Sequence, residues 1–277
     1  MTLTEMRRLM TAHDLRLTKS LGQNFLHDGN QLRKIIQAAE LAAPSPILEV
    51  GPGLGPLTEL LLGAGCPVTA IEMDQRLVTV LRERFADQPG LTLLPGDALA
   101  VLREMQQDWT DFKFVANLPY SVASPLLVDA ALRPTAPSLI VVTLQLEVAQ
   151  RIQARAGTAE YGLLSLLIGW RYAAESSFRI PGSCFFPAPD VDSACIRLRR
   201  RPAPLVSGET LIRFQRVVRQ AFSQRRKMMW KLLRVLWEEE VLAAGFSAAA
   251  IGREARAETV SLEQFVKLTE GLPDLVV

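Results

Sequence analysis

The stretch Pro46–Thr58, PILEVGPGLGPLT, decides the fold of this chain. It begins with a short, mostly apolar run, Ile47–Val50, of the kind that forms a buried parallel strand. Three glycines then follow at alternate positions, Gly51, Gly53 and Gly55. Leucines recur at helical spacing from Leu57 onward. The order is strand, glycine turn and helix, and the glycines allow a sharp turn and let a ligand approach main-chain N–H groups.

Glycine-rich turns between a strand and a helix often bind the pyrophosphate of a dinucleotide. The pattern here is E-x-G-x-G-x-G, and Pro56 occupies the position of the third glycine in the dinucleotide pattern G-x-G-x-x-G. Glu49 also places a carboxylate beside the turn, where it suits a cationic ligand better than a phosphate. The turn therefore favours S-adenosylmethionine over NAD, and a turn that needs glycine only for packing is the third interpretation.

Composition predicts a globular protein with a large core and a basic region. The chain has 277 residues, 49% of them hydrophobic, and a net charge of only +2. Between Arg197 and Trp237, however, there are twelve Lys and Arg residues against one acid, Glu209. Such a region indicates a polyanionic partner. The composition changes near Pro202–Gly208, which predicts a domain of residues 1–204 and a small helical, basic domain of residues 205–277.

The cysteines predict neither a metal site nor a disulfide framework. Cys66, Cys184 and Cys195 are scattered, and none has metal-ligand spacing. The N-terminus lacks the apolar core of a signal peptide, and no apolar run is long enough to span a bilayer. We therefore expect a cytoplasmic protein without a metal site. We also expect a monomer.

The N-terminal part is expected to begin with a helix around Leu3–His13 and to continue as a polar loop, Leu17–Leu26. In that loop Lys19, Gln23 and Asn24 have the chemistry to touch a phosphate, a base or a cofactor. A merely solvated loop is the alternative. A second helix is expected over residues 31–41 and ends before Pro44.

An acidic residue closes the second expected strand, Val68–Ile71. This residue is Glu72, and in a doubly wound sheet an acid at that position reaches the two hydroxyls of an adenosine ribose. NAD and S-adenosylmethionine both carry this ribose, so Glu72 predicts a nucleoside cofactor without choosing between them. We interpret Asp74, on the next turn, as a surface acid that caps the following helix.

Asp97 follows the third expected strand, Leu91–Leu94. Its carboxylate could accept a hydrogen bond from the adenine amino group of the cofactor. It could equally cap the helix expected over Ala98–Met105. The local sequence does not separate the two roles.

Asn117-Leu118-Pro119-Tyr120 is the most specific motif in the chain. It follows the fourth expected strand, Lys113–Ala116, at the edge where open α/β sheets bind ligands. Asn117 offers a carbonyl acceptor, Pro119 stiffens the turn so that main-chain carbonyls point outward, and Tyr120 offers a flat stacking face. Together they can hold an exocyclic amino group between two acceptors, which we favour over a tight proline turn without a function.

The pattern beyond this motif predicts further strands over residues 138–146, 161–172 and 195–198, and a helix over 147–155. A loop rich in proline and aromatic residues, 181–192, contains Phe185 and Phe186, which could supply a second stacking face. Packing against the edge of the sheet is the alternative for one of them. From Leu211 onward the chain is helical in pattern. The run 219–229 places Arg225, Arg226 and Lys227 for phosphate contacts, with a merely solvated basic face as the alternative.

The motifs together resemble the ribosomal RNA adenine N6-dimethyltransferase family, and within it the bacterial enzymes that act on 16S rRNA. The matching motifs occur in family order: SLGQNFL (20–26), ILEVGPGLG (47–55), AIEMD (70–74), GDAL (96–99), NLPY (117–120), FFPAPDVDSA (185–194) and AFSQRRKMM (221–229). The resemblance runs from about residue 16 to the C-terminal helices. NLPY and the two end motifs are the most telling.

The resemblance implies a class I methyltransferase fold, which is a Rossmann-like α/β fold with a seven-stranded, mostly parallel sheet, and a small all-α C-terminal domain. It also implies S-adenosylmethionine as the cofactor, with contacts from Asn24, Leu26, Gly51, Glu72, Asp97 and Asn117. It assigns Asp97 to the adenine amino group and Phe185 to the second stacking face. Lys19 and the C-terminal cations would bind RNA.

The implied reaction is N6,N6-dimethylation of two adjacent adenosines near the 3′ end of 16S rRNA, during ribosome biogenesis. Asn117 with the Leu118 or Pro119 carbonyl would orient the amine, and Tyr120 and Phe185 would sandwich the flipped base. One alternative is a 23S rRNA adenine methyltransferase of the antibiotic-resistance type. Others are a nucleic-acid-binding factor that has lost catalysis and, least favoured, an NAD-dependent dehydrogenase.

Overall fold

A computed structural model describes residues 1–15 and 23–274. The chain divides into two compact units. The first comprises residues 1–149 and 174–200, and the second comprises residues 150–173 and 201–277. The segment 150–173 therefore belongs with the C-terminal residues, although it lies far from them in sequence. A functional boundary at residue 204 stays a prediction.

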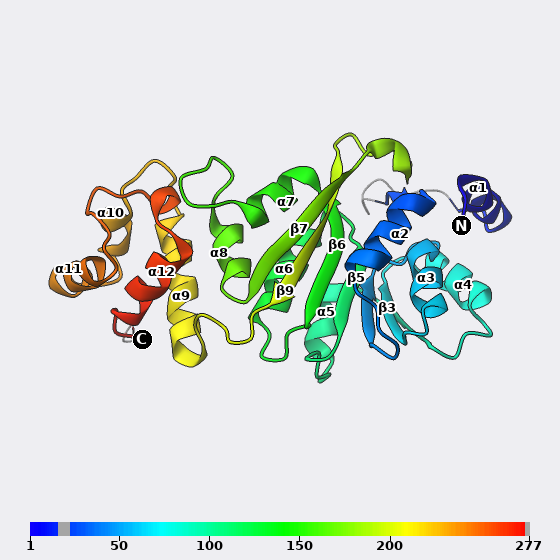
Figure 1. The fold of residues 1–277 in the computed structure, drawn as a ribbon, viewed down its shortest axis with the longest axis horizontal. Coiled ribbons are helices and arrows are strands. Elements are labelled where there is room, and N and C mark those ends of the chain that lie inside the picture. The colour runs from blue at the N-terminus through cyan, green and yellow to red at the C-terminus, as the bar shows by residue number, and fades with distance from the viewer. Residues whose placement is uncertain (16–22, 275–277) are drawn as a thin grey trace. The chain divides into compact units, whose positions relative to one another are not determined.

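The first unit is built on a seven-stranded sheet in the order β4-β3-β2-β5-β6-β9-β7 (Figure 1). The strands are β2 (Ile47–Val50), β3 (Val68–Glu72), β4 (Leu91–Pro95), β5 (Lys113–Asn117), β6 (Leu139–Gln145), β7 (Tyr172–Ile180) and β9 (Ser193–Arg200). Strands β2 to β6 pair in parallel, and β9 joins β6 antiparallel. This confirms the predicted class I methyltransferase architecture.

Helices cover both faces of this sheet because its central strands are apolar on both sides. Helices α2 (Gly29–Ala38) and α3 (Pro56–Gly63) pack together on one face, and α5 (Ala98–Glu104) and α6 (Ala123–Leu132) on the other (Figure 1). Helix α4 (Gln75–Arg84) contacts β3 and β4. Every residue of β2 is buried. The sheet therefore forms a rigid floor whose carboxyl edge is free to carry a site.

The N-terminal part returns to this edge. Helix α1 (Leu3–Ala12) begins with a capping box between Thr2 and Glu5. Strand β1 (Phe25–Leu26) then pairs antiparallel with β8 (Phe185–Phe186), with Leu26 opposite Phe185. A 3-10 turn, Gly182–Cys184, precedes β8. The motifs at residues 20–26 and 185–194 are thus joined by backbone pairing.

The prediction of a strand over residues 161–172 was wrong. The segment forms helix α8 (Leu163–Gly169) and then enters β7. Ser165 begins the helix by accepting the backbone N–H of Gly162, and it donates to the Arg151 carbonyl. Because the helix is buried nearly all round, its residues read as a continuous apolar run, which periodicity cannot distinguish from a buried strand.

The described part of residues 201–277 forms four α-helices. These are α9 (Gly208–Ala221), α10 (Met229–Leu233), α11 (Glu239–Ala248) and α12 (Leu262–Glu270), with a 3-10 turn at Ala257–Thr259. Helix α9 buries Phe214, Val217 and Val218, and the Phe222 ring stacks on Phe265 of α12. This confirms the predicted helical C-terminal part.

Helix α7 (Leu146–Gln153) follows β6, close to the helix predicted there. The helical pattern predicted from Leu211 onward is interrupted within residues 219–229, because α9 ends at Ala221 and turns connect it to α10. No helix in residues 1–15 or 23–274 has the length and apolarity to cross a membrane.

Candidate active site

A cavity of about 260 Å³ lies at the carboxyl edge of the sheet in the first unit. Its walls come from the ends of β2, β3 and β5, the turn after β4, and the N-terminal segment before β1. The predicted site residues that line it are Asn24, Gly51, Glu72, Asp97, Asn117, Leu118, Pro119 and Tyr120. Segments that are far apart in sequence thus meet in one place, as the topology of an open α/β sheet requires.

The glycine turn forms the floor of the cavity. Gly51, Gly53 and Gly55 all have positive φ, +68°, +62° and +80°, a region that residues with a Cβ rarely adopt. A Cβ on Gly53 would lie 2.7 Å from the ring of Phe25, so the turn also needs glycine to let the N-terminal segment pack on it. The turn therefore needs glycine for its backbone and for its packing.

Glu72 faces the cavity with its carboxylate fixed by two main-chain donors. Its Oε2 accepts the N–H of Gly53 at 3.1 Å and its Oε1 accepts the N–H of Asp74 at 3.0 Å. Burial raises the pKa of this carboxyl, and the main-chain hydrogen bonds oppose that shift. Each oxygen keeps a further lone pair that can accept a ligand hydroxyl.

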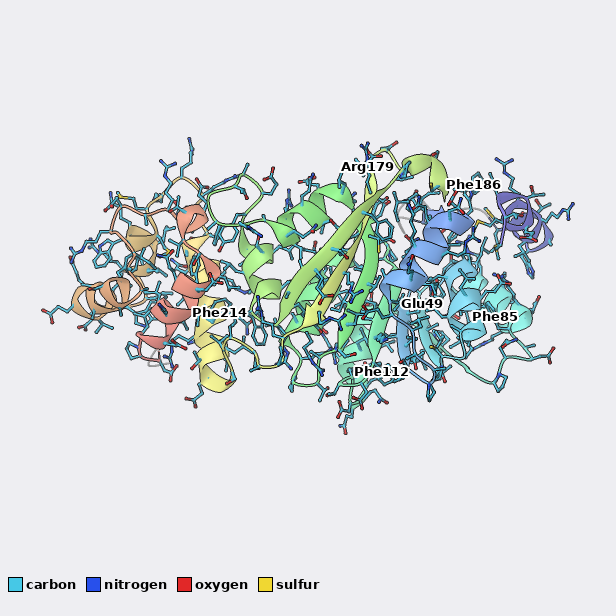
Figure 2. The ribbon with its side chains drawn as sticks, in the orientation of Figure 1. Glu49, Phe85, Phe112, Arg179, Phe186 and Phe214 are labelled. Carbon is cyan, nitrogen blue, oxygen red and sulfur yellow. The ribbon has the colours of Figure 1, made fainter. Side chains whose placement is uncertain are left out.

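Glu49 does not lie at the mouth of the turn, and that interpretation was wrong. Side chains alternate along a strand, so Val50 faces the cavity while Glu49 does not line it. Glu49 is 1% exposed and accepts a hydrogen bond from Thr58 Oγ1 at 2.7 Å (Figure 2). Burial raises its pKa to about 8. The structure therefore removes the argument that the charge of Glu49 favours a cationic ligand.

Asp97 and Asp74 both cap helices. Asp97 Oδ1 accepts the N–H of Ala100 at 3.0 Å, and Asp97 also lines the cavity, so its capping and ligand-facing roles are compatible. Asp74 caps α4 as predicted, but it is buried rather than on the surface. It accepts from Gln23 Nε2 at 3.0 Å and pairs with Arg76, and hydrogen bonds from the Arg76 side chain lower its pKa.

Asn117 lines the cavity and has an unused side-chain acceptor. Its Nδ2 donates to the main-chain carbonyl of Asn24 at 3.0 Å, which fixes the orientation of the side-chain amide. Its Oδ1 is buried and has no hydrogen-bond partner in residues 1–15 and 23–274. A buried acceptor without a partner is costly, so this oxygen is suited to receive an N–H from a ligand.

The rest of the motif is held rigidly around that acceptor. The Leu118 N–H donates to the Thr143 carbonyl at 3.0 Å, and the Pro119 carbonyl accepts the Val122 N–H at 3.2 Å. Tyr120 is half-buried, and burial raises the pKa of its hydroxyl. Pro119 itself packs against Gly51. The motif thus combines an amide acceptor with a flat aromatic wall.

Two of the residues expected to contact the cofactor or the target base do not line the cavity. Phe185 and Leu26 are 3% and 1% exposed and pack in the core beside α2. Phe186 is partly exposed, and the Arg7 guanidinium lies 5.2 Å from its ring centroid (Figure 2). The roles assigned to Phe185 and Leu26 stay predictions.

Sequence reasoning missed three contributors to the cavity or its support. Phe25 packs on the glycine turn, Met73 lines the cavity with 57% of its surface exposed, and Ser193 contacts Tyr120. The exposed Met73 could have been suspected because it follows Glu72 directly. Nothing local to Phe25 or Ser193 signals its partner.

The basic cluster belongs to the second unit. Arg225, Arg226 and Lys227 are exposed in the turns between α9 and α10. Arg225 is partly engaged, because it donates to the Ala159 carbonyl at 2.9 Å and lies 3.5 Å from Glu258. Lys19, the other predicted RNA contact, lies outside the described residues.

Comparison with known proteins identifies the family. The sequence pattern described as ribosomal RNA adenine dimethylase matches residues 15–274. The chain belongs to the ribosomal RNA adenine dimethylase family. Relatives named ribosomal RNA small subunit methyltransferase A include one from Lactiplantibacillus plantarum, 36% identical over 96% of this chain and 93% of the relative. Another, from Myxococcus xanthus, is 38% identical over 97% of this chain and 95% of the relative.

Solved structures agree with this dimethylase assignment. The 23S rRNA methyltransferase ErmE has a TM-score of 0.69 and 30% identity, covering 90% of this chain and 99% of its own. A dimethyladenosine transferase from Plasmodium falciparum has a TM-score of 0.73, with coverage of 88% and 95%, and at 22% identity it supports the fold. The dimethylase therefore has the methyltransferase fold that the sequence predicted.

Proposed function

We propose that this dimethylase transfers methyl groups from S-adenosylmethionine to N6 of two adjacent adenosines near the 3′ end of 16S rRNA, during ribosome biogenesis. The observation that carries the proposal is the buried, unpartnered Oδ1 of Asn117, in a residue that lines the same cavity as Tyr120. An acceptor next to a flat face fits an exocyclic amine on an aromatic base. The names of the relatives support small-subunit rRNA as the substrate.

The residues of the cavity fit the proposed cofactor. Glu72 has free lone pairs for two ribose hydroxyls, Asp97 can accept from the adenine amino group, and Met73 offers an apolar surface to the adenine ring. The turn at Gly51 can approach the methionine part, with Asn24 and Leu26 in supporting roles. When bound, S-adenosylmethionine would supply an electrophilic methyl group on a sulfonium.

Asn117 and a main-chain carbonyl orient the amine. The adenine N6 lone pair is delocalised into the ring, so the enzyme must favour a pyramidal nitrogen. Holding both N–H bonds on two acceptors, Asn117 Oδ1 and a carbonyl of Leu118 or Pro119, aims the lone pair away from them. Because the Pro119 carbonyl already accepts the Val122 N–H, the Leu118 carbonyl is the better second acceptor. Orientation and electrostatics then supply most of the rate.

A general base is not needed for this chemistry. The methylated nitrogen is strongly acidic and loses its proton to water. The second transfer requires the monomethylated amine to return with its one remaining N–H, which Asn117 Oδ1 can accept. The pocket must then accommodate a methyl group where the first hydrogen was.

The base must leave its stack to enter the cavity, and the Tyr120 ring offsets part of that cost. We assign Phe185 to the opposite face, although its burial means that it must become exposed to serve there. Arg225, Arg226, Lys227 and Lys19 are proposed to bind RNA phosphates. We further propose that the enzyme acts in the cytoplasm, as a monomer and without a metal ion.

The second candidate is methylation of 23S rRNA, because ErmE shares the fold at 30% identity. Mapping of the methylated nucleotides separates the two. The dimethylase and labelled S-adenosylmethionine are incubated in two parallel reactions. One contains unmethylated small subunits and the other contains 23S rRNA. Dimethyladenosine at two neighbouring positions near the 3′ end of 16S rRNA is expected. Label only in 23S rRNA would reverse the assignment.

A further inference from the structure

Tyr120 is anchored at its hydroxyl. The hydroxyl lies 2.5 Å from Oγ of Ser193, the first residue of β9. Ser193 is 0% exposed and Tyr120 is half-buried, so this hydrogen bond is partly shielded from water. A tyrosine hydroxyl that is withdrawn from water needs a hydrogen-bond partner, and Ser193 supplies that partner on β9.

The strand register explains how the two residues meet. Asn117 is paired with Thr143 across β5 and β6, and Thr143 with Cys195 across β6 and β9. Ser193 lies two residues before Cys195 on β9, so the two side chains project to the same face of the sheet. The chain that leaves β5 after Asn117 thus carries Tyr120 over the end of β6, and the hydroxyl reaches β9.

The Tyr120 ring is consequently fixed at both ends. On the backbone side, Pro119 packs against Gly51 and the Leu118 N–H is bonded to β6. On the far side, the hydroxyl is bonded to β9. An aromatic wall that is held in one orientation loses less entropy when a base stacks on it.

We propose that Ser193 is a positioning residue that fixes the Tyr120 ring as the wall on which the target adenine stacks. The inference rests on the proposed function. Ser193 does not touch the base, the cofactor or the reacting atoms. It acts through the orientation of Tyr120, which is not among the residues that we assign to the cofactor, and it is therefore expected to affect transfer without affecting cofactor binding.

The test removes the same hydrogen bond from each side. Tyr120→Phe keeps the ring and deletes its hydroxyl, Ser193→Ala deletes the partner, and the double variant deletes both. Ser138→Ala is the matched control, because the Ser138 hydroxyl donates one part-buried hydrogen bond, to the Phe112 carbonyl at 3.0 Å, at the opposite end of β6. Transfer to small subunits, the Kd for S-adenosylmethionine and the melting temperature are measured for each protein.

Each single variant is expected to lower kcat about fivefold, the factor that corresponds to one net hydrogen bond. The double variant is expected to match the singles, because the two groups act as one unit. The Kd for the cofactor stays unchanged in all of them, and Ser138→Ala keeps the wild-type kcat.

If the two substitutions acted independently, their effects would multiply and the double variant would lose about 25-fold in kcat. That result would overturn the role of Ser193. An unchanged kcat in Tyr120→Phe would overturn it too, and this variant remains informative if Ser193→Ala folds poorly. Transfer by the wild-type enzyme is measured first. Its absence would count against the proposed function itself, whereas the comparison between variants decides on Ser193.

Discussion

Gly51 and Pro119 are in such close contact that a Cβ on Gly51 would lie 3.0 Å from Pro119 Cδ. The contact joins the glycine turn, which we assign to the cofactor, to the motif that we assign to the target base. Gly51 also has φ +68°, where a side chain is strained. One glycine therefore sets the distance between the two halves of the site.

Gly51→Ala should lower the free energy of unfolding by about 2 kcal/mol, from backbone strain and displacement of Pro119. It should also lower methyl transfer more than tenfold, a typical cost of about a 1 Å misplacement at a reacting centre. Urea unfolding and transfer assays measure the two effects. Gly63→Ala is the control, because a Cβ there meets nothing within 4 Å. Equal effects of the two substitutions would refute the contact argument.

Glu72→Gln should weaken the binding of S-adenosylmethionine about 10- to 100-fold, the range for a lost hydrogen bond to a charged acceptor. Protonation of Glu72 should weaken the binding of S-adenosylmethionine. Because burial raises the pKa of Glu72, the wild-type enzyme should lose this affinity at a higher pH than it would with a glutamate of ordinary pKa. A glutamine side chain does not titrate in this range, so the variant should lack that loss.

Calorimetric titration with the cofactor between pH 5 and pH 8 measures both effects of Glu72→Gln. Glu104→Gln, on the exposed end of α5, is the control. A variant that binds as tightly as the wild-type protein at pH 8 would remove Glu72 from the cofactor site.

Glu49→Gln should stabilise the protein above neutral pH. Burial raises the pKa of Glu49 from 4.5 to about 8, so the folded state holds a proton that the unfolded state has lost. The free energy of unfolding therefore falls as pH rises from 4.5 to about 8, and glutamine, which mimics the protonated acid, does not contribute to that fall. Unfolding at pH 5, 7 and 9 should show a gap that grows with pH, and a constant gap would contradict the buried, protonated acid.

Charge reversal in the basic turns should weaken RNA binding. Arg226→Glu with Lys227→Glu should raise the Kd for small-subunit RNA and lower the slope of log K against log salt by about 2, since each phosphate contact contributes about 0.9. Arg225→Glu adds to the effect but also disrupts the Ala159 and Glu258 contacts. Lys267→Glu, at an exposed position of α12, is the control for a charge reversal outside the basic turns. An unchanged slope would mean a merely solvated basic face.

Much of the site could be predicted because its residues sit at strand ends. Glu72, Asp97 and Asn117 each follow a recognisable apolar run, and parallel strands bring their carboxyl ends to one edge. The glycine turn and the NLPY motif could be placed for the same reason. The structure brings these residues into one cavity.

What could not be predicted depends on contacts between distant segments. The buried position of Glu49 follows from the register of β2 and from Thr58, and the partner of Tyr120 is Ser193, 73 residues away. Helix α8 was mistaken for a strand because its burial on nearly all sides erases the helical period. Local sequence carries no signal for these features.

The most direct measurement is methyl transfer by Asn117→Ala together with its cofactor affinity. The account predicts that the wild-type enzyme forms dimethyladenosine in unmethylated small subunits. It predicts that the variant keeps its fold and most of its RNA binding but transfers no methyl group, because the amine has lost its acceptor. Full transfer by Asn117→Ala would contradict the central role of the Asn117 oxygen, and with it the mechanism proposed for this site.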